Sequence, residues 1–179
     1  TNKKKICLIH SKEINHPKGS SVNKKVLSVL NNVDQIVANS NYTKNLAINL
    51  GVQEEKIVII NPGIDPVVEV PKKYLDEAEE ILKGKKNRII TVSRFDKRKN
   101  HEKVIMAVRN LKEIYPYIIY TCIGYGDEEE KLKKLVIELK LEEQVTFLKD
   151  IPSDLKNALI SKSDIFVMPS IIYKKSVEG

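Results

Sequence analysis

The sequence predicts an α/β protein in which parallel strands are flanked by helices, and two observations predict it. Short apolar runs rich in Ile and Val alternate with segments whose apolar residues recur at helical spacing. The apolar runs carry few internal charges, which is typical of strands covered on both faces, as in parallel sheets. These runs are 6–9, 35–38, 57–60, 88–93, 118–123, 145–148 and 165–168.

Helical patterns fill the intervals between these runs. Four polar residues stand where helix N-caps are expected, each before an apolar pattern of helical period. They are Ser40, Asn100, Asp127 and Ser153, and the first three precede expected helices that end near residues 50, 115 and 141. Gly51 and Pro116 are expected to end the first two helices, and a separate acidic helix is expected over 73–82.

The strand–helix alternation is interrupted between residues 62 and 86. This segment is rich in proline and glycine, which is typical of a linker. We therefore expect one domain within 1–65, a connecting segment over 66–86 and a second domain within 87–179. The first part has three strand candidates and the second has four, so we expect a fold that is incomplete at both ends.

The composition limits the classes of partner. Hydrophobic residues make up 41% of the 179 residues, which is enough for a packed core, and the net charge is +7. A positive charge favours an anionic partner: a nucleotide phosphate, a nucleic acid or an anionic membrane surface. With only three Phe and no Trp available for stacking, a nucleic-acid partner is not expected.

The cysteines bear on the cellular location. Cys7 and Cys122 both lie in apolar strand-like runs, which indicates buried free thiols in a reducing compartment rather than a disulfide. No apolar stretch approaches the roughly 20 residues that span a bilayer. We therefore expect a cytoplasmic protein, with the inner membrane surface as a further place of contact.

The loops after the strands of the second part carry the candidate chemistry, because ligands of open α/β sheets bind at the carboxyl ends of strands. The loop after 88–93 has four cations in six residues, Arg94, Lys97, Arg98 and Lys99, directly before a helix. An anion there would meet charged side chains and backbone N–H groups together, which predicts a phosphate site. A solvated basic loop is the alternative.

The next loop begins Gly124-Tyr125-Gly126. Glycine lets the backbone approach a ligand closely, although a tight turn explains the same pattern. The third glycine of the dinucleotide fingerprint and a Walker pattern are both missing, which argues against a dehydrogenase or a P-loop enzyme. The loop after 145–148 is Lys149-Asp150-Ile151-Pro152, and it indicates little by itself.

Taken in order and spacing, four stretches resemble glycosyltransferase family four, a group of retaining GT-B enzymes. They are 33–66, 88–111, 123–135 and 145–170, and the final Glu178-Gly179 is similar to the start of the family's E-G-F-G segment. The resemblance implies two Rossmann-like domains facing each other across a cleft. The C-terminal domain would hold a nucleotide-diphosphate-sugar, and the N-terminal domain would meet a glycan, lipid-linked or other acceptor. It also implies retention of configuration, no metal and no cofactor beyond the donor.

The resemblance also implies roles for particular residues. Arg94 and Lys99 would hold the donor diphosphate with help from Arg98, and Gly124 and Gly126 would lie near the donor. The backbone of Ile151, flanked by Lys149 and Asp150, would contact the nucleobase. The catalytic candidates are Glu178, near the sugar and diphosphate, and His10, beside the donor sugar; a surface or strand-capping histidine is the alternative for His10. No catalytic role is expected for His16 or His101.

Two departures from the family pattern matter. The second glutamate of the E-x7-E motif and most of the N-terminal domain are absent from the sequence. We therefore expect a fragment, or the ordered remainder of a longer enzyme. Alone it should be inactive, and its affinity for a donor should be weaker than sub-micromolar. A non-catalytic GT-B-like scaffold or partner subunit is the alternative class, and a basic nucleic-acid-binding module is the least favoured.

Overall fold

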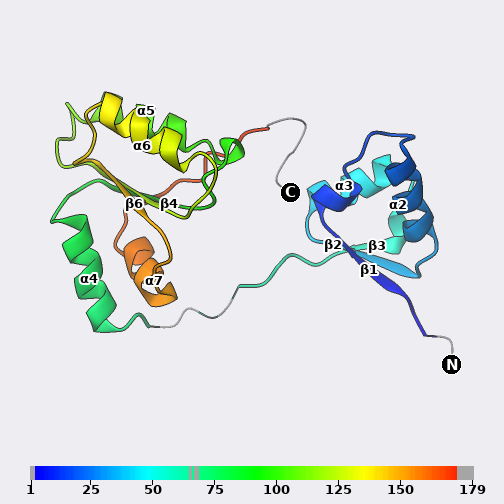
Figure 1. Cartoon of the computed structure of the whole chain (residues 1–179). Coiled ribbons are helices and arrows are strands. Elements are labelled where there is room, and N and C mark those ends of the chain that lie inside the picture. The colour runs from blue at the N-terminus through cyan, green and yellow to red at the C-terminus, as the bar shows by residue number, and fades with distance from the viewer. Residues whose placement is uncertain (1–2, 65, 67–68, 173–179) are drawn as a thin grey trace. The chain divides into compact units, whose positions relative to one another are not determined.

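The computed structural model describes residues 3–64, 66 and 69–172, and these form two compact units. Among the described residues, unit 1 comprises those within 3–66 together with Ile172, and unit 2 comprises 69–171 (Figure 1). In both units, all the strand pairs among the described residues are parallel. The predicted α/β class with helix-flanked parallel sheets is therefore confirmed.

Unit 1 is built on a three-stranded sheet in the order β1-β2-β3. The strands are β1 (Ile6–Ile9), β2 (Gln35–Ala38) and β3 (Ile57–Ile59), and the helices are α1 (Ser11–Ile14), α2 (Ser21–Asn31), α3 (Asn41–Asn49) and the 3-10 turn η1 (Glu54–Lys56). The central strand supplies the fully buried Ile36 and Ala38, which pack with Leu30 of α2 and Ala47 of α3.

Unit 2 is built on a four-stranded sheet in the order β6-β5-β4-β7. The strands are β4 (Arg88–Val92), β5 (Ile119–Ile123), β6 (Val145–Leu148) and β7 (Ile165–Phe166). The helices are α4 (Lys72–Leu82), the 3-10 turn η2 (Lys97–Lys99), α5 (His101–Leu111), α6 (Glu129–Glu138) and α7 (Ser153–Ser161). Helices α5 and α6 cover one face of this sheet, and α4 and α7 cover the other (Figure 1).

The alternation of β5 shows why both faces need helices. Every residue of β5 is buried. Tyr120 and Cys122 belong to the cluster formed with α5 and α6, whereas Ile119 and Ile123 belong to the cluster formed with α4 and α7. A strand with this pattern is a central strand, and its carboxyl end is surrounded by the loops of its neighbours.

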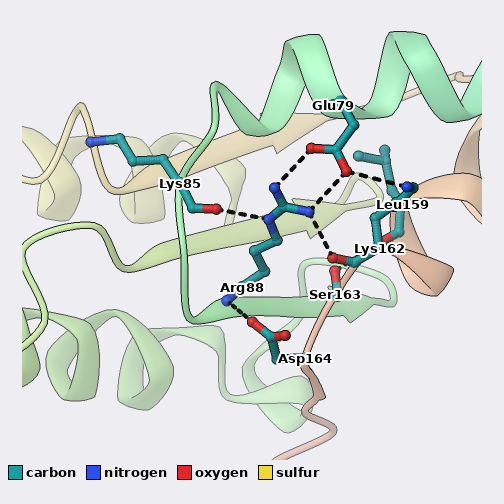
Figure 2. A network of polar contacts seen from close by, with 7 residues as sticks. All are labelled: Glu79, Lys85, Arg88, Leu159, Lys162, Ser163 and Asp164. Carbon is teal, nitrogen blue, oxygen red and sulfur yellow. Dashed lines mark hydrogen bonds and ion pairs between the residues drawn. The ribbon is translucent and has the colours of Figure 1, made fainter.

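Helix α4 lies in the segment expected to connect the domains, and it packs within unit 2. Its Ala78 and Leu82 are fully buried in the same cluster as α7. The Arg88 guanidinium at the start of β4 makes two hydrogen bonds to the Glu79 carboxylate of α4, at 3.1 and 2.8 Å (Figure 2). It also donates to the carbonyls of Lys85 and Lys162, so one side chain joins α4, β4 and the end of α7.

Several predicted details differ from the structure. Ser40 caps α3 through its hydroxyl as predicted, but Asn100 does not accept from the backbone of α5. Asn100 has φ of 56° and donates its side-chain amide to the carbonyl of Pro169 instead. Helix α6 begins at Glu129 after the cap residue Glu128, so Asp127 is not its cap, and Ser153 is the first residue of α7 rather than its cap.

Two further corrections concern α2 and the cysteines. Helix α2 is not among the helices expected from the sequence, and its N-cap Ser20 accepts from the Asn23 amide. Both cysteines are free, as predicted, but only Cys122 is fully buried, and Cys7 is half-buried because β1 is an edge strand of its described sheet.

Candidate functional site

The loops at the carboxyl edge of unit 2 follow the order of the strands. The loop after β4 lies between the loop after β5 and the loop after β7, and the loop after β6 lies beyond the loop after β5. The predicted site residues with described positions in unit 2 therefore fall on three neighbouring loops of one sheet edge, where ligands of such sheets bind.

The loop after β4 is organised around Asp96. Its carboxylate accepts from the Lys99 amide at 3.1 Å and caps η2, while its second oxygen lies 3.7 Å from the Arg94 guanidinium. The Arg94 side chain is 69% exposed, and an exposed ion pair of this length is weak. An anionic ligand of higher charge would compete well with Asp96 for this guanidinium.

The same loop is joined to the loop after β5 by backbone hydrogen bonds. The Phe95 amide donates to the Tyr125 carbonyl, and the Phe95 carbonyl accepts from the Glu128 amide, both at 2.9 Å. A Cβ on Gly124 would lie 2.0 Å from the Ser93 carbonyl oxygen, and one on Gly126 would lie 2.5 Å from the Phe95 carbonyl oxygen. The two glycines therefore permit close contact between two loops, a requirement that the glycine spacing in the sequence does not indicate.

On its other side the loop contacts the segment after β7. The Lys99 ammonium lies 3.9 Å from the Met168 sulfur, and the Arg98 carbonyl accepts from the Ile171 amide at 2.8 Å. Together with the hydrogen bond from Asn100 to Pro169, these contacts hold η2 and Asn100 against the neighbouring loop. Arg94, Arg98 and Lys99 thus belong to one loop that is anchored on both sides.

Lys149, Asp150 and Ile151 follow β6. Lys149 and Asp150 are exposed, and Asp150 has φ of 52°, so the chain turns sharply there. Ile151 packs partly against the cluster formed with α4 and α7. The Leu148 carbonyl accepts from the Gly124 amide at 2.9 Å, which connects the end of β6 to the glycine loop.

His10 belongs to unit 1, and Glu178 lies outside the described residues. His10 directly follows β1, is exposed, and lines a surface pocket at the carboxyl edge of the three strands. The other residues of this pocket are Leu8, Ile9, Val37, Asn39, Ile60, Asn61, Pro62 and Gly63. His10 stands at the N-cap position of α1 but makes no side-chain capping hydrogen bond.

His101 is buried at the base of the loop after β4, which the sequence analysis did not predict. The residue is 2% exposed. One ring nitrogen lies 3.0 Å from the Ser93 hydroxyl, and the other lies 2.9 Å from the Tyr120 hydroxyl. Desolvation lowers the pKa of His101, which the Arg94 backbone and the Asp96 charge only partly offset, so the ring is neutral at pH 7.

The described residues show neither a metal-binding cluster nor a membrane-spanning helix. Within residues 3–64, 66 and 69–172, no group of three or more His, Cys, Asp and Glu side chains is placed to hold a metal ion. In the same part of the chain, no helix is both long and apolar enough to cross a membrane.

Solved structures with the same fold are known. Anabaena HepE, solved in complex with UDP, has a TM-score of 0.74 and 20% identity, and the match covers 92% of this chain and 46% of that one. Sucrose-phosphate synthase from Thermosynechococcus elongatus has a TM-score of 0.68 and 20% identity, over 92% of this chain and 44% of the other. The fold and the loop-lined sheet edge therefore define a Rossmann-like α/β protein of the GT-B type.

Family models assign the chain more closely. Residues 73–179 match the glycosyl transferases group 1, and residues 1–68 match glycosyltransferase family 4. The chain belongs to this family of glycosyltransferases, as the sequence resemblance indicated.

Curated relatives agree with this assignment. The amylovoran biosynthesis glycosyltransferase AmsK of Erwinia amylovora is 32% identical over 69% of this chain, which spans 29% of that protein. A Campylobacter jejuni enzyme named N-acetylgalactosamine-N,N'-diacetylbacillosaminyl-diphospho-undecaprenol 4-alpha-N-acetylgalactosaminyltransferase is 34% identical over 72% of this chain and 34% of its own length. The chain thus spans about a third of the length of these relatives.

Proposed function

We propose that this chain supplies the donor-binding part of a retaining glycosyltransferase that moves a sugar from a nucleotide-diphosphate-sugar to a glycan, lipid-linked or other acceptor. The observation that carries the proposal is the loop after β4, which presents Arg94, Arg98 and Lys99 at the carboxyl edge of unit 2 and is anchored on both sides. Family membership supports it, and HepE, which shares the fold, was solved with UDP and with UDP-glucose.

The proposed chemistry follows from where charge develops. Negative charge grows on the leaving diphosphate as the glycosidic bond breaks, and preorganised cations stabilise this charge well in a site that excludes water. Arg94 and Lys99 would provide that stabilisation, with Arg98 beside them. The nucleobase would lie toward Ile151 on the loop after β6, which is separated from the loop after β4 by two strand spacings, or about 10 Å.

The roles of the catalytic candidates remain part of the proposal. His10 would contact the donor sugar from the N-terminal domain, and its exposed position in a pocket at a carboxyl strand edge supports this. Glu178 would lie near the sugar and diphosphate. In a front-face reaction the leaving phosphate assists the acceptor, so retention of configuration needs no protein nucleophile.

Nucleotide binding by this chain tests the proposal. The amide spectrum of the labelled chain would be followed by NMR while UDP, GDP and ADP are added separately. We expect one of them to shift the resonances of 93–100 and 124–126, with an affinity weaker than micromolar. Arg94→Ala and Lys99→Ala should each weaken binding about tenfold or more, because each removes a charge-assisted hydrogen bond.

Lys86→Ala is the matched control for the change in charge. Lys86 is exposed near the amino end of β4, and its backbone bond to the Tyr117 carbonyl survives the substitution. This variant should bind the nucleotide as the unaltered chain does. If no nucleoside diphosphate shifts any resonance, or if Lys86→Ala weakens binding as much as Arg94→Ala, the donor-site assignment is wrong and a scaffold role is favoured.

We further propose that the enzyme works in the cytoplasm against the anionic inner surface of the membrane. The net charge of +7 supports contact with anionic lipid. Sedimentation with vesicles of phosphatidylglycerol and phosphatidylcholine would test this contact. Binding should require phosphatidylglycerol and fall as salt rises, and equal binding to neutral vesicles would contradict the electrostatic contact.

A further inference from the structure

A chain of buried polar groups runs beneath the loop that carries the candidate diphosphate residues. It begins at the Ser93 hydroxyl, passes through both ring nitrogens of His101 to the Tyr120 hydroxyl, and continues to Thr91. It ends where the Thr91 hydroxyl donates to the Val167 carbonyl at 2.7 Å. Thr91, Tyr120 and His101 are buried, so these three groups make their hydrogen bonds to protein, whereas Ser93 at the end of the chain of polar groups is partly exposed.

The Thr91 end of this chain of polar groups determines which group donates and which accepts in each hydrogen bond. The Val167 carbonyl can only accept, so the Thr91 hydroxyl donates to it and must accept from the Tyr120 hydroxyl at 3.0 Å. With the phenol proton committed to Thr91, the Tyr120 oxygen accepts from Nδ1–H of His101. Burial raises the pKa of Tyr120, so this phenol keeps its proton.

At the Ser93 end, the donor and the acceptor follow from the charge and the tautomer of the His101 ring. With its proton on Nδ1, as the Thr91 end indicates, neutral His101 accepts from the Ser93 hydroxyl at Nε2. The Arg94 backbone also makes a hydrogen bond with the ring, and its carbonyl would compete for a ring N–H. The alternative acceptor for that hydroxyl, the Arg94 carbonyl at 3.4 Å, is more distant. His101 therefore uses both nitrogens to connect the first residue after β4 with the centre of the sheet.

Loop residues also surround His101. The Phe95 ring lies edge-on to the imidazole with ring centroids 4.9 Å apart, and Asp96 and Lys99 act on the ring electrostatically in opposite directions. Tyr120 and Ser93 contact it through hydrogen bonds from β5 and the end of β4. The imidazole thus lies between the sheet and residues 93–99.

We propose that His101 is a positioning residue for the donor diphosphate: held in its Nδ1–H form by Tyr120, it fixes Ser93 and so places the loop that presents Arg94 and Lys99. This inference rests on the proposed function, since it assigns a cause to the placement of the same loop. A phenylalanine would fill the same space and keep the ring contact with Phe95, but it would lose both hydrogen bonds. The hydrogen bonds, rather than the bulk of the ring, should therefore determine nucleotide affinity.

The experiment combines nucleotide affinity with the tautomer of the ring. UDP dissociation constants would be measured by NMR titration for the unaltered protein and for the variants His101→Phe, Tyr120→Phe and Ile105→Ala. Ile105 is fully buried one turn further along α5 and has no polar side-chain atom, so its truncation lowers stability without removing a hydrogen bond of the polar chain. The imidazole nitrogen shifts of His101 would be recorded at pH 7.5, where the unaltered chain should show protonated Nδ1 and unprotonated Nε2.

We expect His101→Phe to weaken UDP binding tenfold or more and to speed amide exchange across 94–99. Tyr120→Phe should move the proton to Nε2, which then donates to Ser93, and should weaken UDP binding less. Ile105→Ala should leave the UDP affinity within twofold. If His101→Phe cannot be obtained folded, Tyr120→Phe still tests the proposal through the tautomer.

Different results would overturn the positioning role of His101 and the proposed function. If the unaltered chain binds UDP and His101→Phe binds it within twofold, or if the unaltered ring is protonated on Nε2, His101 is not the positioning residue. If the unaltered chain binds none of UDP, GDP and ADP, the proposed function and the diphosphate role both fail. Faster amide exchange of 94–99 in His101→Phe would then still show that His101 orders the loop.

Discussion

The carbonyl oxygen of Ser93 lies 2.0 Å from the point that a Cβ on Gly124 would occupy, so the loops after β4 and β5 meet backbone to backbone. The Ser93 amide also donates to the Ile123 carbonyl, which extends the pairing of β4 and β5 into the loops. Ser93 begins the cationic loop and also contacts His101, so this meeting point connects the glycine motif to the candidate site.

Gly124→Ala should therefore destabilise unit 2 strongly. The added Cβ meets backbone atoms that cannot rotate away, and φ of 148° is unfavourable for a side chain. We expect a loss of about 2–4 kcal/mol in the free energy of unfolding, measured by urea denaturation. Gly84→Ala is the control, because φ is 63° there but no atom lies within 4 Å, and it should cost about 1–2 kcal/mol. Equal costs would refute the close approach.

Arg88 provides a second stability test, at the amino end of β4. Arg88→Ala removes the donor for the Lys85 and Lys162 carbonyls as well as the partner of Glu79 (Figure 2). The two lost carbonyl bonds should cost about 1–3 kcal/mol in urea denaturation. Glu79→Gln should cost clearly less, because the Glu79 side chain is 41% exposed and is readily hydrated. A larger loss for Glu79→Gln would show that the ion pair dominates.

The strands were predictable because burial on two faces leaves a compositional record. All seven apolar runs contain a strand, although the run over 165–168 becomes the two-residue β7. Helix ends were less predictable because they depend on partners distant in sequence. Asn100 was predicted to cap α5, but its amide is committed to Pro169, 69 residues away, and no local pattern records that contact.

The candidate site was likewise predictable from the sequence only in part. The cationic loop could be located from sequence, because four cations at a strand–helix junction are a local feature. The burial of His101 could not, since it depends on Ser93, Tyr120 and Phe95 meeting across two strands and a loop. The sequence signal is that Thr91 and Ser93 are polar residues two positions apart at the end of the run 88–93, and therefore on one face of it.

Thr121 offers a substitution that should stabilise the protein. It lies on the opposite face of β5 from Tyr120, and among the described residues its buried hydroxyl has no hydrogen-bond partner. Burying an unpaired hydroxyl is unfavourable, so Thr121→Val should raise the free energy of unfolding by up to about 1 kcal/mol. Thermal and urea unfolding would both detect this gain. A loss of similar size would indicate that the hydroxyl has a partner in solution.

His101 should also make stability depend on pH. Burial lowers its folded-state pKa below the ordinary value of 6.5, so the unfolded chain takes up a proton first as the pH falls. The contribution of the neutral ring is fully present above 6.5 and is lost as the pH falls through the folded pKa, by at most about 1.4 kcal/mol per pH unit. Glu79, Glu102 and Glu129 also have lowered pKa values, but the ordinary pKa of a glutamate is 4.5, so their losses fall at lower pH.

The measurement is urea unfolding of unit 2 at pH 7.5, 6.5 and 5.5 with constant ionic strength, for the unaltered chain and for His101→Phe. The unaltered chain should lose more stability than the variant between pH 6.5 and 5.5, because only it has a buried ring to charge. His101→Gln serves the same comparison if the phenylalanine variant folds poorly. Parallel curves for the unaltered chain and the variant would mean that His101 ionises equally in the folded and unfolded states, and that burial does not lower its pKa.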